Sequence, residues 1–272
     1  MNDETQSSSP VLRIFSYLPN PRVWKSLIAG RLSGVEVETR GAKPNELSQW
    51  LWDFDARRLA ASEQDAGSAN ARTGRRGFAG LLFKTDAFLA AHPFGTVPAA
   101  YSPDGRIGIF ESNSILRAVA RAGNDSAQLY GTNDYEASRI DSFLDAGLVF
   151  AREAQVYLLG VADVTEEGYD RMAAAYEFYL AGVEAALAEG DYLAGDTLSI
   201  ADISFVCDFA QFLREGHYEE QLSAKGFALI SENGASKYQR SFDHMLELSE
   251  RPEFAEVMGT YVNWYRRKAE AK

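Results

Sequence analysis

The sequence predicts an α/β domain followed by an all-α domain. Three observations support this prediction. The chain has 272 residues, which is near the length at which a single hydrophobic core divides into two. Short apolar strands alternate with helical segments in residues 11–123, and from residue 134 onward apolar residues recur at spacings of three and four. We therefore expect an N-terminal βαβ…ββα domain over 11–123 and a helical domain over 134–272.

The first domain begins with a βαβ pattern. Residues 11–16 form a short apolar segment typical of a buried strand, and residues 22–32 carry an apolar helical face. Residues 35–38 alternate as a strand does. Consecutive strands joined by a helix are usually parallel, so we predict a parallel pair.

The first domain ends with a predicted hairpin and helix. Residues 85–91 read as a short helix, and 97–101 and 107–110 read as strands joined by the turn Ser102-Pro103-Asp104-Gly105. Ser112 is in position to cap a helix that runs to about residue 122. The polar stretch 124–133 is a plausible linker.

Residues 40–80 interrupt this pattern. Aromatic residues at its start precede the small and polar stretch SEQDAGSANARTGRRG, which could bury little surface. We expect an insertion that is partly helical at first and mobile afterwards. A solvated loop with a few anchoring aromatics is the favoured interpretation, and a lid or subunit contact is the alternative.

Composition excludes several classes of function. The net charge of −12 argues against nucleic acid as a partner. A single cysteine and three widely spaced histidines match no metal-binding pattern. The acidic first ten residues lack the features of a signal peptide, and no apolar run is long enough to span a membrane. We expect a disordered leader over 1–10 and a cytoplasmic protein without a metal.

Two motifs carry a resemblance to a known family. The segment HPFGTVPA at 92–99, followed by FESNSI at 110–115, closely resembles the glutathione-transferase pattern NPFGx(V/I)PA…(F/L)ESxAI. The segment YLAGDTLSIAD at 192–202 is similar to the signature of that family's helical domain, (F/Y)LxGxxx(S/T)xAD. The resemblance implies a thioredoxin-like first domain that binds glutathione as a co-substrate, and a helical second domain that binds the acceptor.

The resemblance assigns glutathione-binding roles to six residues. In the family, a cis proline exposes the backbone of the preceding residue, which pairs with the cysteinyl part of glutathione as an added strand would. The γ-glutamyl group is held where a strand passes into a helix. In the phi class of the family, a lysine 12 residues before the Thr96 position holds the glycine carboxylate, and a solvated surface lysine is the alternative for this position. The residues at these positions are Lys84, Thr96, Val97, Pro98, Glu111 and Ser112.

The group that would stabilise the glutathione thiolate lies in the loop after the first strand. Family members use Tyr, Ser or Cys there, and the loop of this chain, FSYLPNPR at 15–22, has no cysteine. Alignment by the Tyr-x-Pro pattern favours Tyr17, alternation along the strand could equally turn Ser16 inward, and Asn20 could supply an amide donor.

The helical domain would provide the acceptor pocket. Candidate residues in its first helix are Phe143, Phe150, Arg152 and Tyr157. In the second motif, Ser199 and Asp202 form a capping box, for which we predict a folding role. Cys207 follows in an apolar run and is predicted to be a core residue.

The resemblance leaves two functions open. The first is a glutathione transferase that joins glutathione to an electrophile, with detoxification or aromatic catabolism, including aryl-ether (β-etherase) cleavage, within the breadth of the family. The second is a non-catalytic scaffold, because residues 16–34 and 192–213 resemble the transferase domain of the elongation factor 1 gamma subunit. Either would form a homodimer, or a heterodimer with a related subunit.

Overall fold

The structure is a computed structural model that describes residues 9–74, 78, 80–123, 127–234, 236–263 and 265–266. Most of the predicted leader therefore lies outside the described residues. The chain divides into two compact units, Met1–Ala127 and Gln128–Lys272. The first combines strands and helices and the second contains helices, which confirms the predicted fold class.

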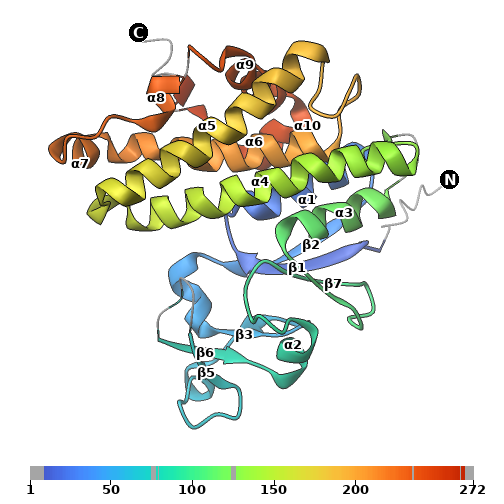
Figure 1. The fold of residues 1–272 in the computed structure, drawn as a ribbon. Helices are drawn as coiled ribbons and strands as arrows, with labels where there is room; N and C mark the ends of the chain where they lie inside the picture. The colour runs from blue at the N-terminus through green and yellow to red at the C-terminus, as the bar shows by residue number, and fades with distance from the viewer. Residues whose placement is uncertain are drawn as a thin grey trace. The chain divides into compact units, whose positions relative to one another are not determined.

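The first unit contains a mixed sheet of four strands in the order β2-β1-β7-β8. Strand β1 (Leu12–Tyr17) lies in the middle, parallel to β2 (Val37–Ala42) and antiparallel to β7 (Ala99–Tyr101). Strand β8 (Gly108–Phe110) pairs with β7 as the predicted hairpin. The parallel pair expected from the βαβ pattern is present (Figure 1).

Two helices of this unit pack against each other. Helix α1 (Pro21–Ser33) starts after the cap Asn20 and ends at Gly34, and α3 (Ser112–Ala122) follows β8. Between them the Lys25 ammonium donates to Asn113 Oδ1 at 2.9 Å, and both side chains are buried. This hydrogen bond ties together the two helices that follow β1 and β8.

The prediction of a solvated loop over 40–80 is wrong for the described residues. They fold into a second sheet of four short strands in the order β4-β3-β6-β5. Its elements are η1 (Pro44–Gln49), β3 (Trp50–Trp52), β4 (Arg57–Arg58), η2 (Ala61–Glu63), β5 (Ala71–Thr73) and β6 (Leu81–Lys84), and α2 (Asp86–Ala91) follows.

Long-range pairing and burial explain why this segment is ordered. Strand β3 pairs in parallel with β6, about thirty residues later, and the Trp52 side chain is completely buried. Its indole ring meets Phe15 of the first sheet edge-on, with 5.4 Å between the ring centroids. The two sheets therefore share one core, to which Leu47, Leu82 and Phe88 also contribute.

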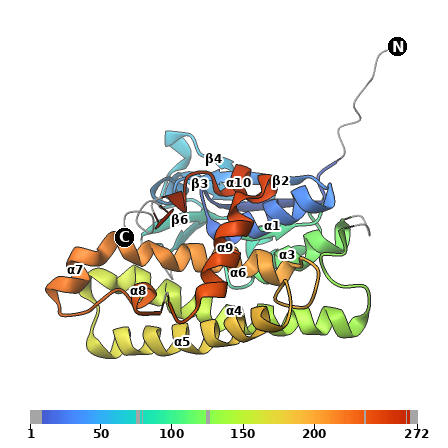
Figure 2. The ribbon, with the colours of Figure 1, turned by 90° about the horizontal axis from the view of Figure 1, so that it is seen from above.

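The second unit is helical, and α4 and α5 run side by side in it (Figure 2). Helix α6 packs against α4 and α9, and all of its residues except Gln211 are buried, including Cys207 as predicted. The helices are α4 (Asp134–Gly160), η4 (Val161–Asp163), α5 (Glu166–Glu189), α6 (Ile200–Phe212), η5 (Leu213–Tyr218), α7 (Glu219–Ala224), α8 (Ile230–Gly234), α9 (Gln239–Glu250) and α10 (Pro252–Met258).

The predicted capping box at the start of α6 is confirmed. Asp202 is fully buried, and its carboxylate accepts from the Ser199 N–H at 2.9 Å and from the Leu193 N–H at 2.9 Å. His244 of α9 also lies against it, with Nε2 2.9 Å from Asp202 Oδ1. One carboxylate thus joins the loop before α6, the start of α6, and α9.

Replacing Asp202 tests this role. Asp202→Ala leaves several buried donors without an acceptor, so the free energy of unfolding should fall by about 3–5 kcal/mol, measured by urea denaturation. The control is Asp196→Ala in the same motif, where the side chain is exposed and the change should stay within about 0.5 kcal/mol. Equal stability of the two variants would contradict the capping role.

A second prediction concerns the pairing of β1 with β2. Gly41 lies opposite Ser16 with φ of 148°, and a Cβ atom there would be 1.7 Å from the Ser16 carbonyl oxygen. Gly41→Ala should therefore force the strands apart and cost about 2–4 kcal/mol of unfolding free energy. Gly67→Ala is the matched control, since the nearest atom to its Cβ is at 3.4 Å. A wild-type unfolding midpoint for Gly41→Ala would refute the close approach.

Candidate functional site

The predicted glutathione-binding residues gather at one edge of the first sheet. Strands β1 and β2 end together at Tyr17 and Ala42, and Phe15 of β1 lies opposite Ala99, the first residue of β7. Ala99 in turn lies opposite Phe110, the last residue of β8. The loop after β1, the residues before β7 and the start of α3 therefore all leave the sheet at this edge.

Ser16 and Asn20 are linked within the loop after β1. The Asn20 Oδ1 atom accepts from the Arg22 N–H at 2.9 Å, which caps α1. Its Nδ2 group donates to Ser16 Oγ at 3.0 Å. Both side chains are buried, with 1% of Ser16 and 0% of Asn20 exposed.

Tyr17 points to the other face of β1. Its ring lies near Phe78, with 6.3 Å between the ring centroids, and packs against the core cluster that contains Phe15 and Trp52. Alternation along the strand explains the separation, because Phe15 and Tyr17 share one face and Ser16 takes the opposite one. The structure thus joins Ser16 with Asn20 and places Tyr17 apart from them.

The residues before β7 leave a stretch of backbone unpaired. The Val97–Pro98 peptide bond is cis, as is Leu18–Pro19. Val97 is half-buried, and among the described residues neither its N–H nor its C=O bonds to another backbone group. These two groups are therefore able to pair with an extended peptide.

Glu111 and Ser112 form the junction between β8 and α3. Glu111 has a backbone φ of 66° and ψ of 125°, a conformation that residues other than glycine rarely adopt. Its side chain is exposed. Ser112 is the first residue of α3 and is 7% exposed. The first N–H groups of a helix lack intrahelical partners and attract anions, so this junction is suited to a carboxylate.

Lys84 supports the loop before β7. It is the last residue of β6, and its ammonium donates to the Gly95 carbonyl at 2.7 Å and lies 4.4 Å from the centre of the Trp52 ring. The side chain is 8% exposed, and this burial lowers its pKa. Thr96, half-buried, directly follows the carbonyl that Lys84 holds.

The four predicted acceptor residues do not come together within the helical unit. Phe150 stacks on Tyr179 in its core, with 4.8 Å between ring centroids. Tyr157 is also buried and donates to Glu215 Oε1 at 2.8 Å. Arg152 is exposed on α4. The helical spacing that suggested a pocket therefore reflects core packing for Phe150 and Tyr157.

Phe143 lines a separate hollow of about 470 Å³ in the helical unit, together with Arg139, Tyr192 and the end of α5. The Arg139 guanidinium lies over the Phe143 ring at 4.8 Å from its centre. Phe143 is one of the residues that line this hollow, and the other three candidates are not among them.

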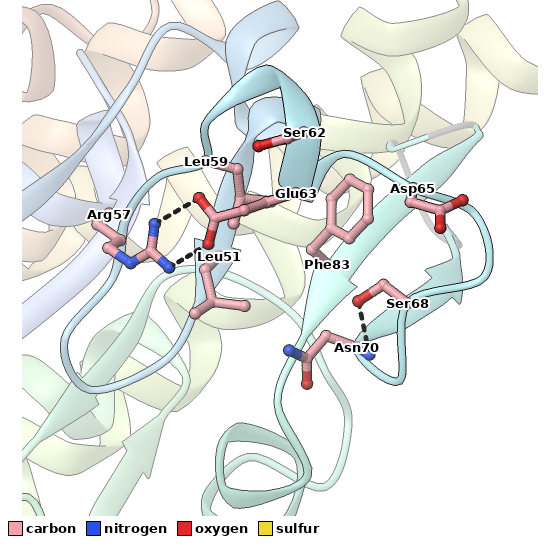
Figure 3. Close-up of a pocket in the computed structure, with 9 residues that line it drawn as sticks. All are labelled: Leu51, Arg57, Leu59, Ser62, Glu63, Asp65, Ser68, Asn70 and Phe83. Carbon is pink, nitrogen blue, oxygen red and sulfur yellow. Dashed lines mark hydrogen bonds and ion pairs between the residues drawn. The ribbon is translucent and has the colours of Figure 1, made fainter.

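Sequence reasoning missed a polar hollow on the second sheet, of about 280 Å³ (Figure 3). On one side of it, Arg57 makes two hydrogen bonds to the Glu63 carboxylate, which hold the pKa of Glu63 at about 2. Ser62, Asp65, Ser68 and Asn70 also line it, and Leu51, Leu59 and Phe83 complete it. No sequence motif marked it, because the residues meet only when the insertion folds.

Two features are absent from the part of the chain that the structure describes. No helix among them is both long enough and apolar enough to cross a membrane. No cluster of three or more His, Cys, Asp or Glu side chains that could hold a metal ion occurs in the same part of the chain.

Comparison with known proteins gives two groups of relatives. The chain is 29% identical to elongation factor 1-gamma 1 of Oryza sativa subsp. japonica over 245 residues, covering 88% of this chain and 46% of that protein. It is 26% identical to the glutathione S-transferase-like protein LUC7 of a Fusarium species over 269 residues, covering 97% and 91%. It thus spans less than half of that elongation factor and most of LUC7. No family model matches the chain.

Solved structures show the fold. The glutathione transferase URE2P6 of Phanerochaete chrysosporium, in complex with oxidized glutathione, matches with a TM-score of 0.63 at 14% identity, over 93% of this chain and 97% of that one. A glutathione S-transferase of Methylobacillus flagellatus with glutathione bound matches with a TM-score of 0.60 at 12% identity, over 90% and 98%.

The fold is therefore that of the glutathione S-transferases. The predicted resemblance to their superfamily, and within it to elongation factor 1 gamma, is confirmed by relatives of both kinds.

Proposed function

We propose that this protein is a glutathione transferase, which binds glutathione at the shared edge of β1, β7 and α3 and activates its thiol. The observation that carries the proposal is the convergence of three groups at that edge. These are the unpaired Val97 backbone, the helix start at Ser112, and the buried hydroxyl and amide of Ser16 and Asn20.

All three residues of glutathione would meet groups that can form hydrogen bonds or ion pairs with them. The Val97 N–H and C=O would pair with its cysteinyl residue, beside the turn made by Pro98. The Ser112 hydroxyl and the first N–H groups of α3 would hold the γ-glutamyl carboxylate, and Glu111 would accept from the γ-glutamyl ammonium. Lys84 has three N–H donors and uses one on Gly95, so it could also reach the glycine carboxylate near Thr96.

The chemistry is formation and use of a thiolate. A free thiol has a pKa of about 8.5, so little of it is ionised at neutral pH. Hydrogen-bond donors and the start of α1 favour the ionised form, and the thiol proton passes to water. The sulfur then forms a bond to an electrophilic carbon, and either a leaving group departs with the displaced electron pair or the adduct takes a proton from water.

The acceptor is proposed to be a hydrophobic electrophile. Phe143 and Arg152 remain candidates to contact it, since Phe150 and Tyr157 are core residues. An acceptor screen should include aryl ethers as well as activated aryl halides and alkenes. We also propose a cytoplasmic dimer, with an identical or related subunit.

A scaffold without transferase activity is the second candidate. Similarity to elongation factor 1-gamma 1 over 88% of this chain favours it, because that relative is named for translation elongation and not for glutathione. The two functions differ in one measurable property: the transferase binds glutathione and the scaffold does not need to.

The role of Ser112 gives a direct test. If its hydroxyl meets the γ-glutamyl carboxylate, Ser112→Ala should weaken glutathione binding by about 1–3 kcal/mol, measured by calorimetric titration. Ser114→Ala, in the same helix but past its first residue, is the control and should bind as the wild type does. Wild-type affinity in Ser112→Ala would remove Ser112 from the site.

A further inference from the structure

The second sheet has an apolar face that the shared core does not use. Trp52 of β3 lies opposite Lys84 of β6, and this pair belongs to the face that meets the first sheet. The preceding pair, Leu51 and Phe83, points to the other face, because side chains alternate along a strand. Leu51 and Phe83 form the apolar floor of the polar hollow, and Leu59 completes it. None of the residues that line this hollow belongs to the proposed glutathione site.

Hydrogen bonds hold the two sides of the hollow in place. On one side, the Glu63 carboxylate accepts two bonds from Arg57. On the other side, Ser68 Oγ accepts from the Asn70 N–H at 3.3 Å, and the Asn70 carbonyl accepts from the Lys84 N–H at 2.8 Å (Figure 3). The hollow is therefore formed before any ligand binds, which lowers the entropy cost of binding.

Several polar groups of the rim have no partner within the protein. Among the described residues, nothing bonds to the side-chain amide of Asn70 or to the Ser62 hydroxyl. Asp65 accepts from the Gly67 N–H through Oδ1 at 3.0 Å and leaves Oδ2 unused. Ser68 accepts through its oxygen and keeps its proton to donate. The rim thus presents both donors and acceptors above an apolar floor.

Charge and size restrict the ligand. Among the described residues that line the hollow, Arg57 alone is positively charged, and the Glu63 carboxylate neutralises it. The Asp65 carboxylate leaves this lining with one net negative charge, which disfavours phosphates and carboxylates. The volume of about 280 Å³ is near the lower end of the range for small-molecule sites, roughly 300–1,000 Å³.

We propose that this hollow binds a small neutral polyol of the size of one pyranose sugar. A hydroxyl group both donates and accepts, so it matches a rim that offers both kinds of partner. The carbon face of the sugar ring would lie over Leu51 and Leu59, and the ring hydroxyls would bond to Asn70, Asp65 and Ser62. This site is separate from the glutathione edge and does not depend on the function proposed above.

The test is a titration of the isotope-labelled protein with glucose, galactose, mannose and N-acetylglucosamine, followed by the chemical shifts of its backbone amides. At least one of these neutral sugars should bind saturably and shift the signals of residues 59–70. A ligand of this size should have a dissociation constant on the order of 1 mM. A phosphorylated glucose should bind more weakly than the neutral sugar, because the lining carries a net negative charge.

Variants of the rim locate the binding. Asn70→Ala removes one donor and one acceptor and should weaken binding by about 3- to 30-fold. Ser62→Ala should weaken it by about 2- to 10-fold, and it provides a second test if Asn70→Ala does not fold. The matched control is Asn45→Ala, since Asn45 is exposed on η1 of the same insertion and does not line the hollow. This control should bind as the wild type does.

Three results would overturn the proposal. The first is that none of the four sugars binds saturably. The second is that a sugar binds folded Asn70→Ala and Ser62→Ala as tightly as the wild type, which would place its site elsewhere. The third is that glucosamine, which carries an ammonium group, binds more tightly than every neutral sugar, because the ligand class would then be an amine held by the Asp65 carboxylate.

Discussion

The candidate site depends on the place of β1 in the first sheet, between the parallel strand β2 and the antiparallel strand β7. Pairing in parallel with β2 and antiparallel with β7 makes the end of β1 coincide with the end of β2 and with the beginning of β7. The hairpin partner β8 then ends at the same edge. Residues almost a hundred positions apart, such as Ser16 and Ser112, therefore leave the sheet on the same side.

The second sheet, formed by the insertion, contacts both the loop before β7 and strand β1. Its strand β6 ends in Lys84, whose ammonium holds the Gly95 carbonyl just before Thr96 and Val97. The Trp52 ring beneath that ammonium also meets Phe15 in the middle of β1. Order in the insertion is thus connected to both the loop before β7 and the strand that carries Ser16. Lys84 has a structural role here whether or not it also contacts glutathione.

The sequence predicted most of the first sheet and the helical unit, because their patterns are local. A βαβ order implies a parallel pair, and the spacing from Ser199 to Asp202 implies a helix start, and both are present. The second sheet escaped prediction because its strands are two to four residues long and pair across the insertion. A three-residue strand such as Trp50–Trp52 shows no periodicity by itself.

The site was predicted unevenly for a similar reason. The motifs around Val97 and Ser112 pointed to residues that the fold brings to one edge. Helical spacing grouped Phe150 with Arg152 and Tyr157, but spacing does not distinguish a core face from a pocket, and two of these side chains are buried. The sequence does not display the hydrogen bond that joins Asn20 to Ser16, or the packing of Tyr17 near Phe78.

The most direct test of the account is calorimetric titration with glutathione in buffers of different ionisation enthalpy, which counts the protons released on binding. Below the pKa of the free thiol, a site that stabilises the thiolate should bind glutathione and release a fraction of a proton, and S-methylglutathione should bind without that release. Binding without proton release would contradict thiol activation at this edge. Absence of binding would contradict the glutathione site itself.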